Sequence, residues 1–214
     1  FIGFSITDFN KNKVLYSVCY DLQKLNKKTK LASDKNQYQT NKRKHELIEI
    51  YKDIFQKCTH FKVSIFSIED LNFKVVLESR TEFNRLTKNV WNRTLQENQI
   101  NKHCNALGIK LIKVNPMYSS FMGNLIFKDY DPIASSRMIA ERAQNKYTKG
   151  FKILGGIERI DQEKLDYLLG KNISNNYKSW KQLYSEIGEL PYRNKVVNQS
   201  KNFKSNKSRV ILTI

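Results

Sequence analysis

Residues 115–143 read NPMYSSFMGNLIFKDYDPIASSRMIAERA, and they place Asp131 at the entrance of an expected helix that follows a strand. The strand spans residues 109–114, and the helix runs to about Lys146 along small and apolar positions. An N-cap aspartate followed by a first-turn proline, Pro132, explains both residues without any chemistry. A carboxylate exposed at one edge of an α/β sheet explains them equally well.

In the rest of the chain, β-prone runs alternate with amphipathic runs. Residues 63–68 form an almost unbroken β-prone run, which is typical of a strand covered on both faces. The expected elements are a hairpin of residues 1–6 and 14–20, a short strand near Leu31, a helix capped by Thr40 or Asn41, the strand of residues 63–68, a helix of residues 82–107 stopped by Gly108, the strand of residues 109–114 and the helix from Asp131. This order predicts an α/β protein with a mixed sheet flanked by helices.

The composition suggests a polyanionic partner. The 214 residues include 38 Lys+Arg against 20 Asp+Glu, a formal net charge of +18. Nucleic acid is the partner that this balance favours. No apolar run is long enough to span a bilayer, and residues 1–10 lack the pattern of a signal peptide, so we expect a cytoplasmic protein without a membrane partner.

The cysteines predict no structural zinc site. Cys19, Cys58 and Cys104 are odd in number, far apart and form no CxxC pair. His103 beside Cys104 is expected to be an ordinary helix residue, because neighbours on a helix point about 100° apart.

Glu69 is the second acidic residue of interest, since it ends the run of residues 63–68. Glu69 at a strand end and Asp131 at a helix entrance are expected to converge on one edge of the sheet. Converging carboxylates bind magnesium, which serves phosphodiester cleavage in nucleases. The alternative is that Glu69 and Asp70 merely end a strand at the surface.

In four segments the chain resembles the RuvC-like, RNase H-like nuclease domain of TnpB proteins. These are transposon-encoded RNA-guided DNA nucleases related to type V CRISPR effectors. The resemblance covers about residues 1–147, through KRKHELIEIYKDIF, SIEDLNF, LGIKLIKVNPMYSS after Trp91, and DPIASSRMIAERA.

The resemblance implies a Mg²⁺- or Mn²⁺-dependent DNA endonuclease in which Glu69 and Asp131 bind metal. The first strand of the family reads Gly-Ile-Asp, whereas this chain has Gly3-Phe4-Ser5, so a hydroxyl stands where a carboxylate is expected. Ser5 or Asp8 is expected to complete the site. Ser5 holds the first position, whereas Asp8, three residues later, would reach the site from the hairpin turn only if the chain bends, because side chains alternate across a strand. The chain also lacks the cysteines of the family's zinc ribbon, as ribbon-less members do.

The basic residues expected to contact nucleic acid lie at the start of the first long helix and in the segment DPIASSRMIAERA. They are Lys42, Arg43, Lys44, Arg137 and Arg142. We expect DNA as partner, together with a guide RNA if a recognition lobe lies elsewhere in a longer chain.

We expect a RuvC-like domain over residues 1–150 and a basic, partly helical extension over residues 151–214. The extension is expected to hold helices at residues 161–169 and 175–187 and an edge strand at residues 210–214. Its aromatic residues Tyr177, Trp180 and Tyr184 recur at helical spacing, which favours packing over base stacking.

Three functions remain open from the sequence. The chain is a metal-dependent endonuclease, a nuclease-dead protein that binds nucleic acid, or an interaction protein that keeps the fold for its shape.

Overall fold

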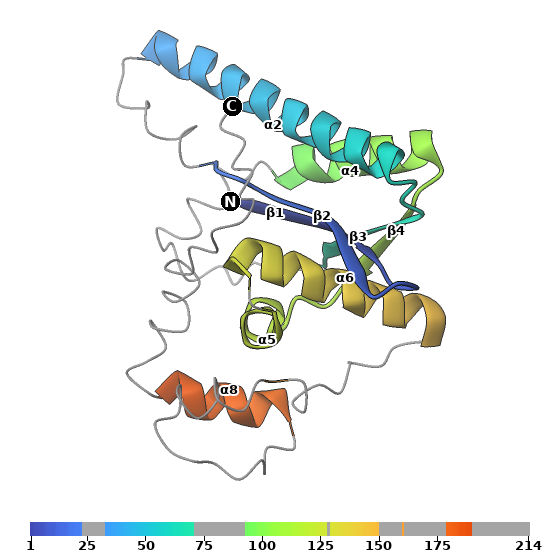
Figure 1. Cartoon of the computed structure of the whole chain (residues 1–214). Helices are drawn as coiled ribbons and strands as arrows, with labels where there is room; N and C mark the ends of the chain where they lie inside the picture. Colours follow the sequence, from blue (N-terminus) through green and yellow to red (C-terminus); the bar gives the residue numbers. More distant parts are fainter. Residues whose placement is uncertain (23–32, 71–92, 128, 150–159, 161–178, 190–214) are drawn as a thin grey trace. The chain divides into compact units, whose positions relative to one another are not determined.

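The computed structural model describes residues 1–22, 33–70, 93–127, 129–149, 160 and 179–189. Strands and helices are mixed along the chain (Figure 1), so the protein is α/β, as predicted. It divides into two compact units. The first holds α2 (Ser33–His60), β3 (Ile65–Glu69), α4 (Arg93–Leu107) and most of β4 (Lys110–Val114). The second holds most of the hairpin of β1 (Ile2–Asp8) and β2 (Lys13–Tyr20), together with α5 (Ser119–Ile126), α6 (Asp131–Lys149) and α8 (Trp180–Glu189). The predicted elements near Leu31 and at residues 161–169 and 210–214 lie outside the described residues.

The hairpin is confirmed. β1 (Ile2–Asp8) and β2 (Lys13–Tyr20) pair in a two-stranded sheet. The Asp8 carboxylate closes the turn by accepting the backbone N–H groups of Asn10 and Lys11 at 3.0 and 3.2 Å. This is the local hydrogen bonding that makes aspartate a frequent turn residue.

Both faces of β1 are covered. Phe4 and Ile6 are buried on one face, where Phe4 lies 6.3 Å from the Tyr16 ring. The alternate face, with Gly3 and Ser5, lies on α6 (Asp131–Lys149). A Cβ on Gly3 would lie 1.9 Å from the carbonyl oxygen of Pro132, so only glycine permits this approach.

α5 (Ser119–Ile126) packs on α6 and was not predicted from the sequence. A Cβ on Gly123 would lie 2.6 Å from the Ala134 carbonyl oxygen, so the two backbones are close. The Ser135 hydroxyl lies 3.4 Å from the hydroxyls of Ser119 and Ser120. Small residues on both helices therefore set their separation.

α8 (Trp180–Glu189) belongs to the second unit and overlaps the helix predicted at residues 175–187, ending two residues later than predicted. Its Trp180 and Leu183 are buried, and the Trp180 ring meets that of Phe121 edge-on at 6.2 Å. The predicted packing role is confirmed for Trp180, while Tyr177 lies outside the described residues. The core cluster consists of Met122, Leu125, Phe127, Ala134, Met138, Ile160, Trp180 and Leu183.

In the first unit, α2 (Ser33–His60) begins before the predicted cap, so the placement of a cap at Thr40 or Asn41 was wrong. The polar stretch before the predicted cap contains Lys35, Gln37 and Gln39, and Lys and Gln are good helix formers. The apolar face appears in the second half, at the predicted spacing. Its buried residues are Leu47, Ile50, Tyr51, Ile54, Phe55 and Cys58.

β3 (Ile65–Glu69) and β4 (Lys110–Val114) pair with each other. The Lys110 N–H donates to the Ser64 carbonyl at 2.9 Å, and because this bond joins the starts of both strands, the two run in the same direction. β3 is less covered than predicted: within it only Phe66 is buried. The continuous apolar run therefore overstated its burial.

α4 (Arg93–Leu107) lies between the two strands in the sequence and corresponds to the second part of the helix predicted at residues 82–107. Residues 82–92 of that prediction lie outside the described residues. α4 packs on α2, where the Phe55 ring of α2 stacks on His103 of α4 at 4.8 Å; Phe55 also stacks on Phe66 of β3 at 4.9 Å. Gly108 ends α4 with φ of 65°, as predicted. None of the helices in the described part of the chain is both long and apolar enough to cross a membrane.

Candidate active site

Asp131 is the first residue of α6, and its side chain reaches toward α5. The Tyr130 carbonyl accepts the first helical hydrogen bond, from the Ala134 N–H at 2.9 Å, which makes Tyr130 the N-cap. The Asp131 carboxylate instead accepts a hydrogen bond at 2.6 Å from the side-chain amide of Asn124. The interpretation of Asp131 as the N-cap of α6 is therefore wrong, because the N-cap is the preceding residue, Tyr130.

The surroundings of Asp131 combine two features. Asn124 is buried, with 6% of its surface exposed, whereas Asp131 is half-buried. A fixed donor thus holds one carboxylate oxygen of a group that solvent still reaches. The positive end of the α6 dipole also favours a negative charge at this position.

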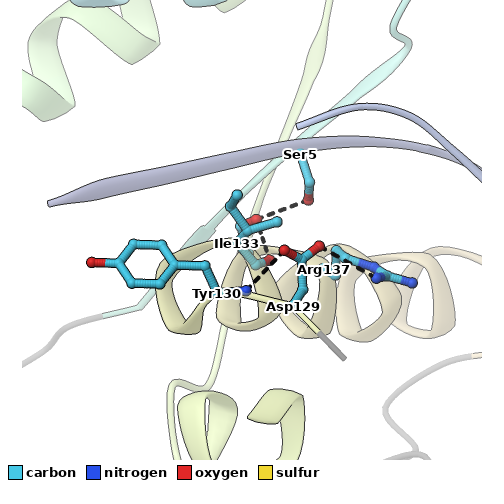
Figure 2. A network of polar contacts seen from close by, with 6 residues as sticks. Ser5, Asp129, Tyr130, Ile133 and Arg137 are labelled. Atoms are coloured by element: carbon cyan, nitrogen blue, oxygen red, sulfur yellow. Dashed lines mark hydrogen bonds and ion pairs between the residues drawn. The ribbon is translucent and has the colours of Figure 1, made fainter. Parts of the chain in front are cut away.

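Asp129 lies two residues before Asp131 but is engaged differently. One of its oxygens accepts the Tyr130 N–H at 2.8 Å, and the other lies 3.7 Å from the Arg137 guanidinium (Figure 2). Arg137 also stacks over the Phe127 ring at 4.0 Å. Arg137, predicted to contact nucleic acid, thus ties the α5–α6 connection to α6.

Ser5 points from β1 toward α6 (Figure 2). The Ser136 hydroxyl donates to the Ile133 carbonyl oxygen at 2.7 Å, and it lies 2.9 Å from the Ser5 hydroxyl, with which it is hydrogen-bonded. Ser136 is five residues beyond Asp131, and five residues rotate a helix by about 140° from the starting face. Ser5 therefore contacts a different face of α6 from the one on which Asp131 lies.

Asp8 contributes to the hairpin turn, as described above, and its second oxygen lies 3.9 Å from the Lys11 ammonium. No described contact links Asp8 with Asp131. Glu69 ends β3 in the first unit, whereas Ser5, Asp8 and Asp131 belong to the second. The convergence of Glu69 with Asp131 stays a prediction.

The described residues contain no group of three Asp, Glu, His or Cys side chains arranged to hold a metal ion. The donor at Asp131 nevertheless fits magnesium, which prefers carboxylate oxygens. Carboxylate ligands are also commonly oriented by hydrogen bonds from a second layer of residues, as Asn124 orients Asp131.

The basic residues fall into two groups. Lys42, Arg43 and Lys44 lie in the polar half of α2, where Lys42 pairs with Glu46 at 3.8 Å and Lys44 is exposed. Arg142 on α6 instead donates to the carbonyls of Asn115 and Met117, at 2.5 and 2.6 Å. The Arg142 guanidinium thus holds the turn before α5.

The three cysteines are buried free thiols. Burial raises the pKa of the Cys58 thiol to about 12 and that of Cys104 to about 11. Thiols that stay protonated are poor metal ligands and poor nucleophiles. His103, stacked on Phe55, has its pKa lowered, first by burial and then by nearby lysines.

Comparisons of the chain with protein-family models, with curated proteins and with solved structures gave no match. The case for function therefore comes from the residues themselves.

Asn124 and the turn-holding contacts of Arg142 are the features that sequence reasoning missed. Asn124 lies in GNLIF, a run with little helical periodicity, and its importance depends on the packing of α5 against α6. The local pattern around Arg142 also contains nothing that marks a contact 27 residues away.

Proposed function

We propose that this chain carries a metal-dependent nuclease site of the RuvC-like type, on an RNase H-like domain related to that of TnpB proteins. The observation that carries the proposal is the hydrogen bond of 2.6 Å from the buried Asn124 amide to the Asp131 carboxylate. Asp131 does not act as the N-cap of α6, since Tyr130 takes that position. A capping role would explain the residue without chemistry, and that explanation no longer applies.

In this proposal Asp131 and Glu69 hold magnesium or manganese. The bound ion would supply the charge that activates water and stabilises the leaving oxygen in phosphodiester hydrolysis. Asn124 keeps the Asp131 carboxylate in one orientation through the hydrogen bond of 2.6 Å.

Nucleic acid is the proposed substrate. The net charge of +18 supports a polyanionic partner, and the exposed basic residues of α2 offer phosphate contacts. DNA follows from the resemblance to TnpB proteins, and a guide RNA is proposed on the same ground.

The proposal is tested by cleavage of labelled single- and double-stranded DNA by the purified chain in Mg²⁺ or Mn²⁺. We expect Asp131→Asn and Glu69→Gln each to reduce cleavage at least 100-fold, on the order of the loss when a metal-site group is removed. Asp129→Asn and Glu97→Gln are matched controls. These carboxylates pair with Arg137 and Lys113 at 3.7 and 3.5 Å, so their substitution should leave the rate within a few-fold.

A second function is binding of nucleic acid without cleavage. Ser5 favours it, because its neutral hydroxyl stands at the expected first carboxylate and packs on Ser136 at 2.9 Å. DNA binding with no cleavage in either metal, unchanged by Asp131→Asn and Glu69→Gln, would establish this function instead of the nuclease. Cleavage that survives both substitutions would contradict the assigned site.

A further inference from the structure

We infer that Asn124 is a positioning residue for the metal-binding carboxylate of Asp131, an inference that rests on the proposed function. The two side chains meet at 2.6 Å between the Asn124 Nδ2 and an Asp131 oxygen. They are seven residues apart and belong to different helices, α5 and α6, so the contact depends on how these helices pack.

The packing around Asn124 explains why its amide can act as a fixed donor. Asn124 is buried, and so are its neighbours Met122, Gly123 and Leu125 on α5. The close approach of Gly123 to the Ala134 carbonyl leaves no space for α5 to move toward α6. An amide held in this way has little rotamer freedom to lose when Asp131 binds a cation.

The bond selects between the two oxygens of Asp131. One oxygen accepts the amide hydrogen, so the carboxylate cannot rotate freely, and the other is directed to one orientation. A divalent cation gains from this arrangement, because the ligand is oriented before binding and less conformational entropy is lost. Residues that hydrogen-bond to metal ligands typically contribute about 10- to 100-fold to metal affinity.

The alternative is that Asn124 only ties α5 to α6. The helices share other polar contacts, such as those of the Ser135 hydroxyl with Ser119 and Ser120 at 3.4 Å. A purely structural tie at Asn124 would affect stability in the way that these contacts do. It would not change the affinity of Asp131 for a cation.

The test is Mn²⁺ binding, measured by isothermal titration calorimetry and by the electron paramagnetic resonance signal of free Mn²⁺, on the full chain. Asn124→Leu keeps the side-chain shape and removes the donor, and Asn124→Ser keeps a hydroxyl that is too short to reach Asp131. We expect both to weaken Mn²⁺ binding about 10- to 100-fold. Ser135→Ala, which removes a hydroxyl from the same helix interface, should bind Mn²⁺ as the wild type does.

Circular dichroism melts identify any variant that fails to fold. If Asn124→Leu does not fold, Asn124→Ser still tests the loss of the amide donor. Gly123→Ala gives an independent check. It forces α5 away from the Ala134 carbonyl, so it should also weaken Mn²⁺ binding although Asn124 and Asp131 are both still present. In an Asp131→Asn background, Asn124→Leu should have no further effect on Mn²⁺ affinity.

The outcomes separate the inference from the proposed function. Mn²⁺ affinity lowered by Asp131→Asn but unchanged in folded Asn124→Leu and Asn124→Ser would overturn the positioning role and leave the metal site intact. Mn²⁺ affinity unchanged by Asp131→Asn, or no binding by the wild type, would overturn the metal site and with it the inference.

Discussion

Lys62 holds a backbone conformation that normally belongs to glycine. Its φ is 53°, and it follows α2 in the place that Gly108, with φ of 65°, takes after α4. The hydrogen bonds match as well: Val63 N–H bonds to the Cys58 carbonyl at 2.9 Å, as Ile109 N–H does to Cys104 at 2.9 Å. Both helices thus end in a Schellman motif, and only one of them uses glycine.

We predict that Lys62→Gly is more stable than Lys62→Ala by about 1 kcal/mol, because the left-handed conformation costs an L-residue that amount and glycine little. Both variants lose the same charge, so the comparison isolates the backbone term. The measurement is the free energy of unfolding from urea titration. Gly108→Ala should lower it by a similar amount, and equal stability of the two Lys62 variants would refute the prediction.

For single residues, the sequence predicted correctly only those features that follow from the residue type itself. Gly108 was found because glycine after a helical run marks its end, while nothing in the type of Lys62 announces a left-handed position. Asp131 was placed at the right helix entrance, yet its partner could not be inferred, because a hydrogen bond to Asn124 depends on tertiary packing.

At the scale of elements, periodicity and length decided which predictions held. The hairpin, β4 and α6 were predicted because turn residues or a proline mark their ends. α5 has only eight residues, and Ser, Gly and Asn are weak helix formers, so its helix depends on burial against α6. Missing α5 meant missing Asn124, the residue that fixes the candidate carboxylate.

The contact between α2 and α4 buries groups that must remain protonated. Tyr51 donates to the Gln96 side chain at 3.0 Å, and burial raises the pKa of its phenol far above 10.0. Burial likewise raises the pKa of Cys58 and Cys104 from 9.0. In the unfolded chain these groups lose protons from about pH 9 upward, while the folded chain keeps them.

We therefore predict full stability from these groups below about pH 9 and a loss as pH rises toward 12, since the unfolded state then releases protons first. The measurement is the urea midpoint between pH 8 and pH 11. Tyr51→Phe should make the fall above pH 10 shallower, because the Tyr51 hydroxyl no longer titrates in the unfolded chain. Tyr38→Phe, at a position on α2 that is 66% exposed, should follow the wild type; a Tyr51→Phe curve parallel to the wild type would contradict this account.

At the scale of the whole molecule, the excess of positive charge is the property most certain to affect binding. A net charge of +18 attracts any polyanion, so affinity alone says little about a specific surface. The salt dependence of binding is more informative, because each phosphate contact releases condensed counterions. On duplex DNA each contact makes the negative slope of log K against log salt steeper by about 0.9.

We predict that duplex DNA binding weakens steeply between 50 and 200 mM salt, and that Lys42→Ala, Arg43→Ala and Lys44→Ala combined reduce the slope by about 2 to 3. These residues occupy consecutive positions in the polar half of α2, where the helix places them around its exposed surface. Fluorescence anisotropy of labelled DNA over a salt series measures the slope. The control removes three exposed lysines from separate elements, Lys13, Lys102 and Lys181, with the same change in net charge. A smaller slope in the α2 variant than in the control assigns phosphate contacts to α2, whereas equal slopes would mean that DNA responds only to the overall charge.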